Sequence, residues 1–239
     1  MWRKFKSGNH LKTDHPIKSG LAAARACLVP GIILQCVGVL ILVLYFRIPQ
    51  GKAFFDAVAD MQSGFSWAGD TAFKIACYLF FSAFVPLVFC FALPRLRPPR
   101  PWWRAVAFAV GFWFIMAVSV VFLYMAQARM FGMERDIWTL LKKTAFDQFV
   151  YSAFYGAPLV AVAHFWKDRG YKFSAVAEML RSEGWFGRLI VPTLFMSWVV
   201  WIPMLFVIYS LPFPLQTHIG GLVNGFWSLI SLQIAARAK

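Results

Sequence analysis

The residues best placed for chemistry lie in one short stretch, where Lys142 and Lys143 precede Asp147 and Gln148 at the start of an apolar run. Lys143 and Asp147 are four residues apart, so on a helix they share a face and can form an ion pair. Such a pair reduces the cost of holding a carboxylate at membrane depth, and Gln148 can hydrogen-bond to a neighbouring helix. The stretch is either a polar lining for a solute path or a structural clamp between helices, and we favour the clamp.

The patterns that most enzymes require are missing from the sequence. Asp147 is the one acid expected at or inside an apolar segment, so a paired-aspartate site is ruled out there. No two histidines are spaced as in a zinc protease, and there is neither a P-loop nor a Gly-x-Ser-x-Gly nucleophile elbow. His164 and His218 lie near the ends of apolar segments, as either haem ligands or ordinary interface residues, and we favour the second. We therefore expect no enzymatic activity, no cofactor and no metal.

The composition places the chain in a membrane. Of its 239 residues, 60% are apolar and only 14% are charged, against roughly a quarter in a soluble domain. A disordered chain would be poor in apolar residues, and one soluble domain of this size could not bury 26 Phe and 11 Trp. Four cysteines, none in a Cys-x-x-Cys pair, read as packing residues rather than a disulfide framework or a zinc site; they are Cys27, Cys36, Cys77 and Cys90.

Six apolar stretches approach the roughly 20 residues that a helix needs to cross a bilayer. They predict an all-α integral membrane protein, a bundle of about six transmembrane helices, with four as the lower bound. A basic N-terminal interfacial segment (residues 1–25) precedes one transmembrane domain (residues 26–236) and a basic tail (residues 237–239). Trp2 and Phe5 among the cations suggest that this segment lies at an anionic lipid surface, and a frayed basic arm is the alternative. The stretches run over residues 26–46, 75–93, 105–128, 149–166, 189–211 and 219–236.

The distribution of positive charge gives the predicted helices an orientation. With six spans, the two termini and the second and fourth loops share one side, and together they carry 17 Lys and Arg against 7 on the other side. By the positive-inside rule both termini face the cytoplasmic or matrix side. The formal charge of +14 is spread over these loops, so nucleic acid is not an expected partner.

Three loops contain amphipathic runs that predict short interfacial helices. Extension of the neighbouring spans beyond the bilayer is the alternative. Gly184 is placed to end the third of these helices. The apolar positions are Phe54, Phe55, Val58 and Met61 in the first run, Ile137, Leu140 and Leu141 in the second, and Phe173, Val176, Ala177 and Leu180 in the third.

Small and polar residues inside the apolar stretches suggest helix contacts. Gly221 and Gly225 form a Gly-x-x-x-Gly pattern, which lets two helix backbones approach closely. Gln35 and Asn224 join the candidate set for the polar lining or clamp. Kinks are expected at three prolines, which are Pro158, Pro192 and Pro203.

The second loop is a candidate lipid site. Between Arg95 and Arg104 it holds four arginines, three prolines, a Trp pair and no acid. Tryptophans belong at the headgroup level, so we expect contact with anionic lipid, and with cardiolipin if the membrane is mitochondrial. An ordinary positive-inside loop is the alternative. The candidate residues are Arg95, Arg97, Arg100, Trp102, Trp103 and Arg104.

Motifs spread along the chain resemble the Mpv-seventeen family of small peroxisomal and inner-mitochondrial membrane proteins. The N-terminus is similar in its Trp, aromatic and His-Pro pattern, and Gln35 lies near a polar site of that family's first helix. The central Lys-to-Asp-Gln stretch and the C-terminal Trp, Pro and Trp-Ser residues are similar too. The matching residues are Trp2, Phe5, His15, Pro16, Leu141, Lys142, Lys143, Asp147, Gln148, Trp201, Pro203, Pro212 or Pro214, Trp227 and Ser231.

The resemblance implies an all-helical membrane protein without a cofactor, and family members have been described as weakly selective channels. Positions after the Trp-Pro motif, among them Phe206, are apolar here where the family is polar. We therefore expect an accessory subunit of a larger assembly of the inner mitochondrial membrane, such as a respiratory complex, held by lipids and other membrane subunits. A small-solute channel is the alternative function, and the peroxisomal membrane is the alternative location.

Overall fold

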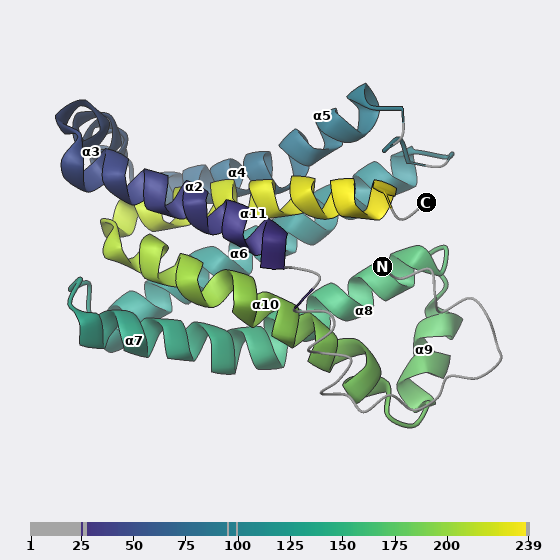
Figure 1. The fold of residues 1–239 in the computed structure, drawn as a ribbon. Coiled ribbons are helices and arrows are strands. Elements are labelled where there is room, and N and C mark those ends of the chain that lie inside the picture. The colour runs from purple at the N-terminus through teal and green to yellow at the C-terminus, as the bar shows by residue number, and fades with distance from the viewer. Residues whose placement is uncertain (1–24, 26–27, 95, 99, 238–239) are drawn as a thin grey trace.

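Every regular element in the described part of the chain is a helix (Figure 1). The computed structural model describes residue 25 and residues 28–94, 96–98 and 100–237. The helices are α2 (Leu28–Arg47), α3 (Pro49–Ser63), α4 (Trp67–Leu79), η2 (Phe80–Phe84), α5 (Val85–Ala92), α6 (Trp103–Phe131), α7 (Ile137–Phe146), η3 (Asp147–Gly156), α8 (Ala157–Asp168), α9 (Phe173–Arg181), α10 (Trp185–Ser210) and α11 (Phe213–Arg237). The predicted all-α class is confirmed. The expected N-terminal interfacial segment, Cys27, Arg95 and the end of the basic tail lie outside the described residues.

Four helical stretches in the described chain are long and apolar enough to cross a membrane. They are Trp67–Ala92, Trp103–Phe131, Ile137–Asp168 and Trp185–Ser210. The pair α2 and α3 makes a fifth only if it counts as one span, because its two helices meet at 94°. The described residues of each of the six predicted stretches lie in helix, apart from Leu93 and Leu211 at two of the ends, but the count of six membrane crossings stays a prediction.

The ends of the helices follow from local sequence. Asp136 caps α7, because its carboxylate accepts hydrogen bonds from the backbone N–H groups of Trp138 (2.9 Å) and Thr139 (3.2 Å). Hydrogen bonding by Thr139 and Trp138 holds the pKa of Asp136 below its ordinary value. Gly132 ends α6 with a φ of 85°, a conformation that favours glycine.

Two stretches of π-helix interrupt the apolar helices in the described chain, and each directly precedes a helix with proline in its first turn. The segment η2 runs into α5, which carries Pro86 in its first turn, and η3 runs into α8, which carries Pro158 in its first turn. Proline has no N–H to donate to the preceding turn, so the regular α-helical hydrogen-bond pattern cannot continue through it. A widened π turn is one way to satisfy the neighbouring backbone groups.

Helix α10 lies at the centre of the bundle and packs against α2, α7, η3, α8 and α11. Its buried face includes Val200, Met204 and Ile208, which belong to one apolar core together with Leu34 of α2 and Val223 of α11. Contact between α2 and α10 is close, since a Cβ at Gly38 would lie 2.8 Å from the sulfur of Met204. The core thus forms where helices distant in sequence cross.

Gly221 and Gly225 lie on the face of α11 that touches α4 and η2. A Cβ added to Gly221 would lie 2.9 Å from the Cα of Tyr78, and one added to Gly225 would lie 2.6 Å from the carbonyl oxygen of Phe81. Both neighbours are backbone atoms, which move only with their helix. The Gly-x-x-x-Gly face therefore brings α11 against another helix of the same chain.

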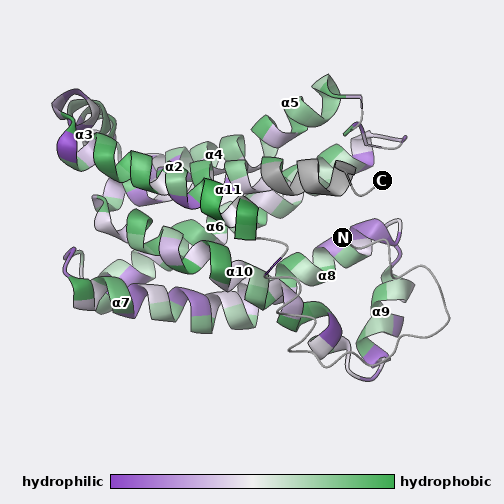
Figure 2. Cartoon of the chain, in the orientation of Figure 1, coloured by the Kyte–Doolittle hydropathy of each residue, from purple (hydrophilic) through white to green (hydrophobic). Residues whose placement is uncertain are grey.

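The cation-rich loops lie at one end of the bundle (Figure 1). The first turn of α6 and the loop between α8 and α9 meet there, where the Tyr171 hydroxyl donates to the carbonyl of Arg104 over 3.1 Å. The loop between α6 and α7 lies at the opposite end. Figure 2 shows that the helices between the two ends are largely hydrophobic.

The three amphipathic runs have different outcomes. The first forms α3, where Phe55 and Val58 pack on the core while Phe54 and Met61 are exposed. The second forms α7, which continues through η3 into α8 and so extends a candidate span. The third forms the separate helix α9, and Gly184, with a φ of 65°, stands before α10 rather than at the last turn of α9.

We predict that Gly225→Ala lowers the thermal unfolding midpoint of the protein in mild detergent. The new Cβ forces α11 away from η2, and overpacking of this kind costs about 1–3 kcal/mol. Gly111→Ala is the matched control, because nothing lies within 4 Å of its Cβ position and alanine favours the helix. Equal midpoints for the two variants would contradict the close contact.

Candidate functional site

The carboxylate of Asp147 lies inside the bundle, at the junction of α7 and η3. It accepts a hydrogen bond from the Tyr209 hydroxyl of α10 over 2.7 Å, and another from the Gln148 side-chain amide over 2.9 Å. The side chain of Asp147 is buried, with 6% of the residue exposed. Each carboxylate oxygen thus has a protein donor, and one donor comes from a different helix.

Lys143 is buried but does not pair with Asp147. Among the described ion pairs within 4 Å the two are not joined, and the Lys143 ammonium lies 5.9 Å from the centre of the Tyr209 ring. The expected pairing assumed a regular α-helix, whereas Asp147 is the first residue of a π-helix and its carboxylate is engaged by Tyr209 and Gln148. Lys143 instead makes a cation–π contact, and its carbonyl accepts a bond from Gln127 of α6 over 3.2 Å.

Gln148 joins η3 to α10 at several points. Its backbone carbonyl accepts a bond from the Trp198 indole over 3.2 Å, and its side-chain oxygen accepts one from the Ser197 hydroxyl over 3.5 Å. The Ser197 and Ser152 hydroxyls are 3.3 Å apart. Together with the bond from Tyr209 to Asp147, these contacts attach one face of η3 to α10 between Ser197 and Tyr209.

The other two predicted polar residues also bond to neighbouring helices. The Gln35 amide of α2 donates to the carbonyl of Val200 on α10 over 2.9 Å. The Asn224 amide of α11 donates to the Ser82 hydroxyl of η2 over 2.9 Å, and both residues are buried. All the predicted polar residues therefore take part in contacts between helices, and Lys143 and Asp147 share Tyr209 as a partner.

Sequence reasoning missed the partners of these residues and one partly buried ion pair. Nothing in the sequence connects Tyr209 with Asp147, because they are 62 positions apart. Asp70 and Lys74 were placed outside the second span, yet they lie within Trp67–Ala92 and pair over 2.6 Å. Their i, i+4 spacing was the signal that could have revealed them.

The loop before α6 forms a pocket of about 490 Å³. Arg97 and Arg100 line it with Pro98, Phe91 and Trp102, and the Arg97 guanidinium donates to the carbonyl of Phe91 over 3.2 Å. Trp103 and Arg104 lie just beyond, with the guanidinium 5.6 Å from the Trp103 ring centre. Two exposed arginines and an aromatic wall suit an anionic group with an apolar body.

The histidines and acids of the described chain do not gather into a metal-binding group. The ring of His164 lies edge-on against Phe108 and Phe112, with ring centres 5.5 Å apart in both pairs. A ring nitrogen of His218 lies 3.0 Å from the carbonyl oxygen of Pro214. Cys36, Cys77 and Cys90 are free thiols.

Compared with known proteins, the chain matches no family model, no curated protein and no solved structure. The resemblance to the Mpv-seventeen family stays a prediction from the motifs.

We predict that Tyr209→Phe destabilises the bundle by about 1–3 kcal/mol, because it removes the donor that binds the buried carboxylate of Asp147. Thermal unfolding in mild detergent measures the loss. Tyr155→Phe is the matched control, since this tyrosine lies on η3, the helix of Asp147, and is 38% exposed. An unchanged midpoint in Tyr209→Phe would show that the bond does not stabilise the fold.

Proposed function

We propose that the protein is a non-enzymatic membrane protein that acts as a structural, accessory subunit of a larger membrane assembly. The observation that carries this proposal is the bonding of its buried polar residues. Asp147, Gln148, Gln35 and Asn224 each hydrogen-bond to another helix or to a neighbour that does. A polar residue used in this way fixes helix packing, which suits the clamp better than a solute path.

The outer surface supports a role in assembly. Phe149 and Phe154 of η3 are 52% and 82% exposed, and Trp138 of α7 is 70% exposed, so this helical stretch presents large aromatic side chains on its outer surface. Exposed apolar patches of this extent mark contact with lipid or with another protein. Because the buried polar residues bond within the bundle, we propose that these exposed aromatic side chains contact the other subunits.

We further propose six membrane crossings, with α3 and α9 at the interface and both termini on the matrix side of the inner mitochondrial membrane. The cation-rich loops before α6 and after α8 share one end of the bundle, in agreement with the positive-inside rule. The motif resemblance to the Mpv-seventeen family favours mitochondria, with peroxisomes second. Anionic lipid at Arg97, Arg100 and Trp102 would hold this end at the membrane surface.

Native-size separation after mild solubilisation tests the accessory role. We expect the chain to migrate with other membrane subunits, as a band much larger than its 27.2 kDa. Unrelated subunits should co-purify in fixed proportion with it. Migration as a single chain or a small homo-oligomer, without partner bands, would rule out this function.

A small-solute channel is the competing function, favoured by one observation. Asp147 opens a π-helical segment, and π-helical turns are frequent at functional sites. If the protein conducts, the purified chain in planar bilayers should show a conductance that Asp147→Ala changes, while Asp136→Ala at the α7 cap leaves it unaltered. A closed wild type, or equal conductance in Asp147→Ala, removes Asp147 from a conduction path.

A further inference from the structure

An apolar groove of about 480 Å³ runs between α6 and α8. Its wall on α6 is a stripe at helical spacing, and on α8 it includes Leu159, Ala163 and Trp166. The stripe covers 13 residues, or roughly 18 Å of helix at a rise of about 1.5 Å per residue. It consists of Trp103, Arg104, Ala107, Phe108, Gly111, Phe112 and Ile115.

Gly111 makes the middle of the groove hollow. A Cβ built on this residue would meet no atom within 4 Å, although Phe108 and Phe112 on either side of it are large. On α8, Ala163 is likewise small. Small residues on both walls, between bulky ones, leave room along the groove, and an apolar chain that filled it would be stabilised by burial.

Positive charge surrounds one end of the groove. Arg104 lines the groove itself, and the Lys167 ammonium lies 5.8 Å from the centre of the Phe108 ring. Arg169 and Lys172 follow in the adjacent loop, against the single carboxylate of Asp168, which lies 3.2 Å from Lys167. The net charge here is therefore positive, at the end where the cation-rich loops meet.

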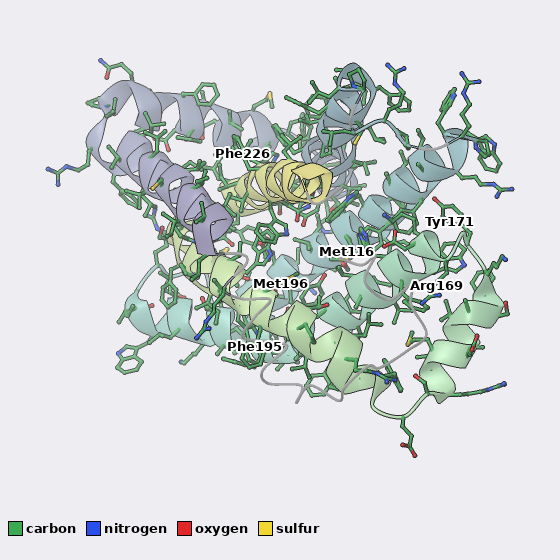
Figure 3. The ribbon with its side chains drawn as sticks, turned by 45° about the vertical axis from the view of Figure 1, so that its right-hand side comes forward. Met116, Arg169, Tyr171, Phe195, Met196 and Phe226 are labelled. Atoms are coloured by element: carbon green, nitrogen blue, oxygen red, sulfur yellow. The ribbon has the colours of Figure 1, made fainter. Side chains whose placement is uncertain are left out.

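Tyr171 closes this end of the groove. Its hydroxyl bonds to the carbonyl of Arg104, and its ring packs edge-on against Trp166, with centres 5.2 Å apart. Figure 3 shows Tyr171 and Arg169 together, beside the first turns of α6. Trp103, Trp166 and Tyr171 thus place amphipathic rings beside the cations, as in the headgroup layer of a membrane.

We propose that this groove binds an anionic phospholipid, with one acyl chain lying along Gly111 and the phosphate beside Arg104 and Lys167. Charge complementarity selects the headgroup, and the apolar walls select the chain. A partner helix fits less well, because a helix is about 10–12 Å wide and one turn would already occupy roughly 400–600 Å³. The groove has about the volume of one helical turn, but this volume extends along the whole α6 stripe, so the groove is too narrow for a helix. The site is independent of the proposed accessory function.

Native mass spectrometry of the full chain tests the proposal. The chain, released from mild detergent, is titrated with dioleoylphosphatidylglycerol and separately with dioleoylphosphatidylcholine. We expect the wild type to retain one phosphatidylglycerol in preference to phosphatidylcholine. Gly111→Leu fills the groove and should weaken phosphatidylglycerol binding about tenfold, or about 1.4 kcal/mol. Val110→Leu, on the exposed outer side of the same helix, should bind as the wild type does.

A second pair of variants tests the headgroup. Arg104→Gln combined with Lys167→Gln should bring the preference for phosphatidylglycerol close to one, while Arg129→Gln at the far end of α6 should preserve it. Ala107→Phe blocks the groove from another position, in case Gly111→Leu does not fold. The proposal is overturned by a wild type without preferential lipid, or by a blocked variant that folds and retains the lipid. Cross-linking of Gly111→Cys to a partner polypeptide in the native membrane would also overturn it.

Discussion

The bundle depends on a carboxylate that must be satisfied where water is excluded. Asp147 meets this requirement with donors from Gln148 and Tyr209, so α10 and the α7–η3 stretch must hold one position relative to each other. A buried polar group left without partners costs several times what a satisfied one contributes. Because α10 also packs on α2, α8 and α11, a contact that fixes α10 against η3 also constrains the helices packed around α10.

The π-helical segments explain why the polar contacts lie where they do. Both are forced near a proline that removes a backbone donor, Pro86 in one case and Pro158 in the other. Ser82 lies in η2 and bonds to Asn224, while Gln148 and Ser152 lie in η3 and contact α10. A widened turn shifts the following residues around the helix, which aims these side chains at neighbours that a regular helix would not present to them.

The order and type of the helices could be predicted from hydropathy, because each apolar stretch is an independent signal. The pairing of Lys143 with Asp147 could not, since it assumed a regular helix through residues that form a π turn. The bond from Tyr209 to Asp147 could not be predicted for a different reason. It depends on how α10 packs against η3, and no local sequence pattern determines that packing. The contact face of α11 could be predicted, because the four-residue spacing of Gly221 and Gly225 places both on the side of the helix that touches its neighbours.

The right-angle corner between α2 and α3 limits how these two helices can move. They meet at 94°, so if one of them lies along the membrane normal the other does not. Gly51 lies at the corner, where a Cβ would be 2.3 Å from the carbonyl oxygen of Leu44. Because the corner is packed this tightly, its angle is fixed, and any tilt of α2 carries α3 with it.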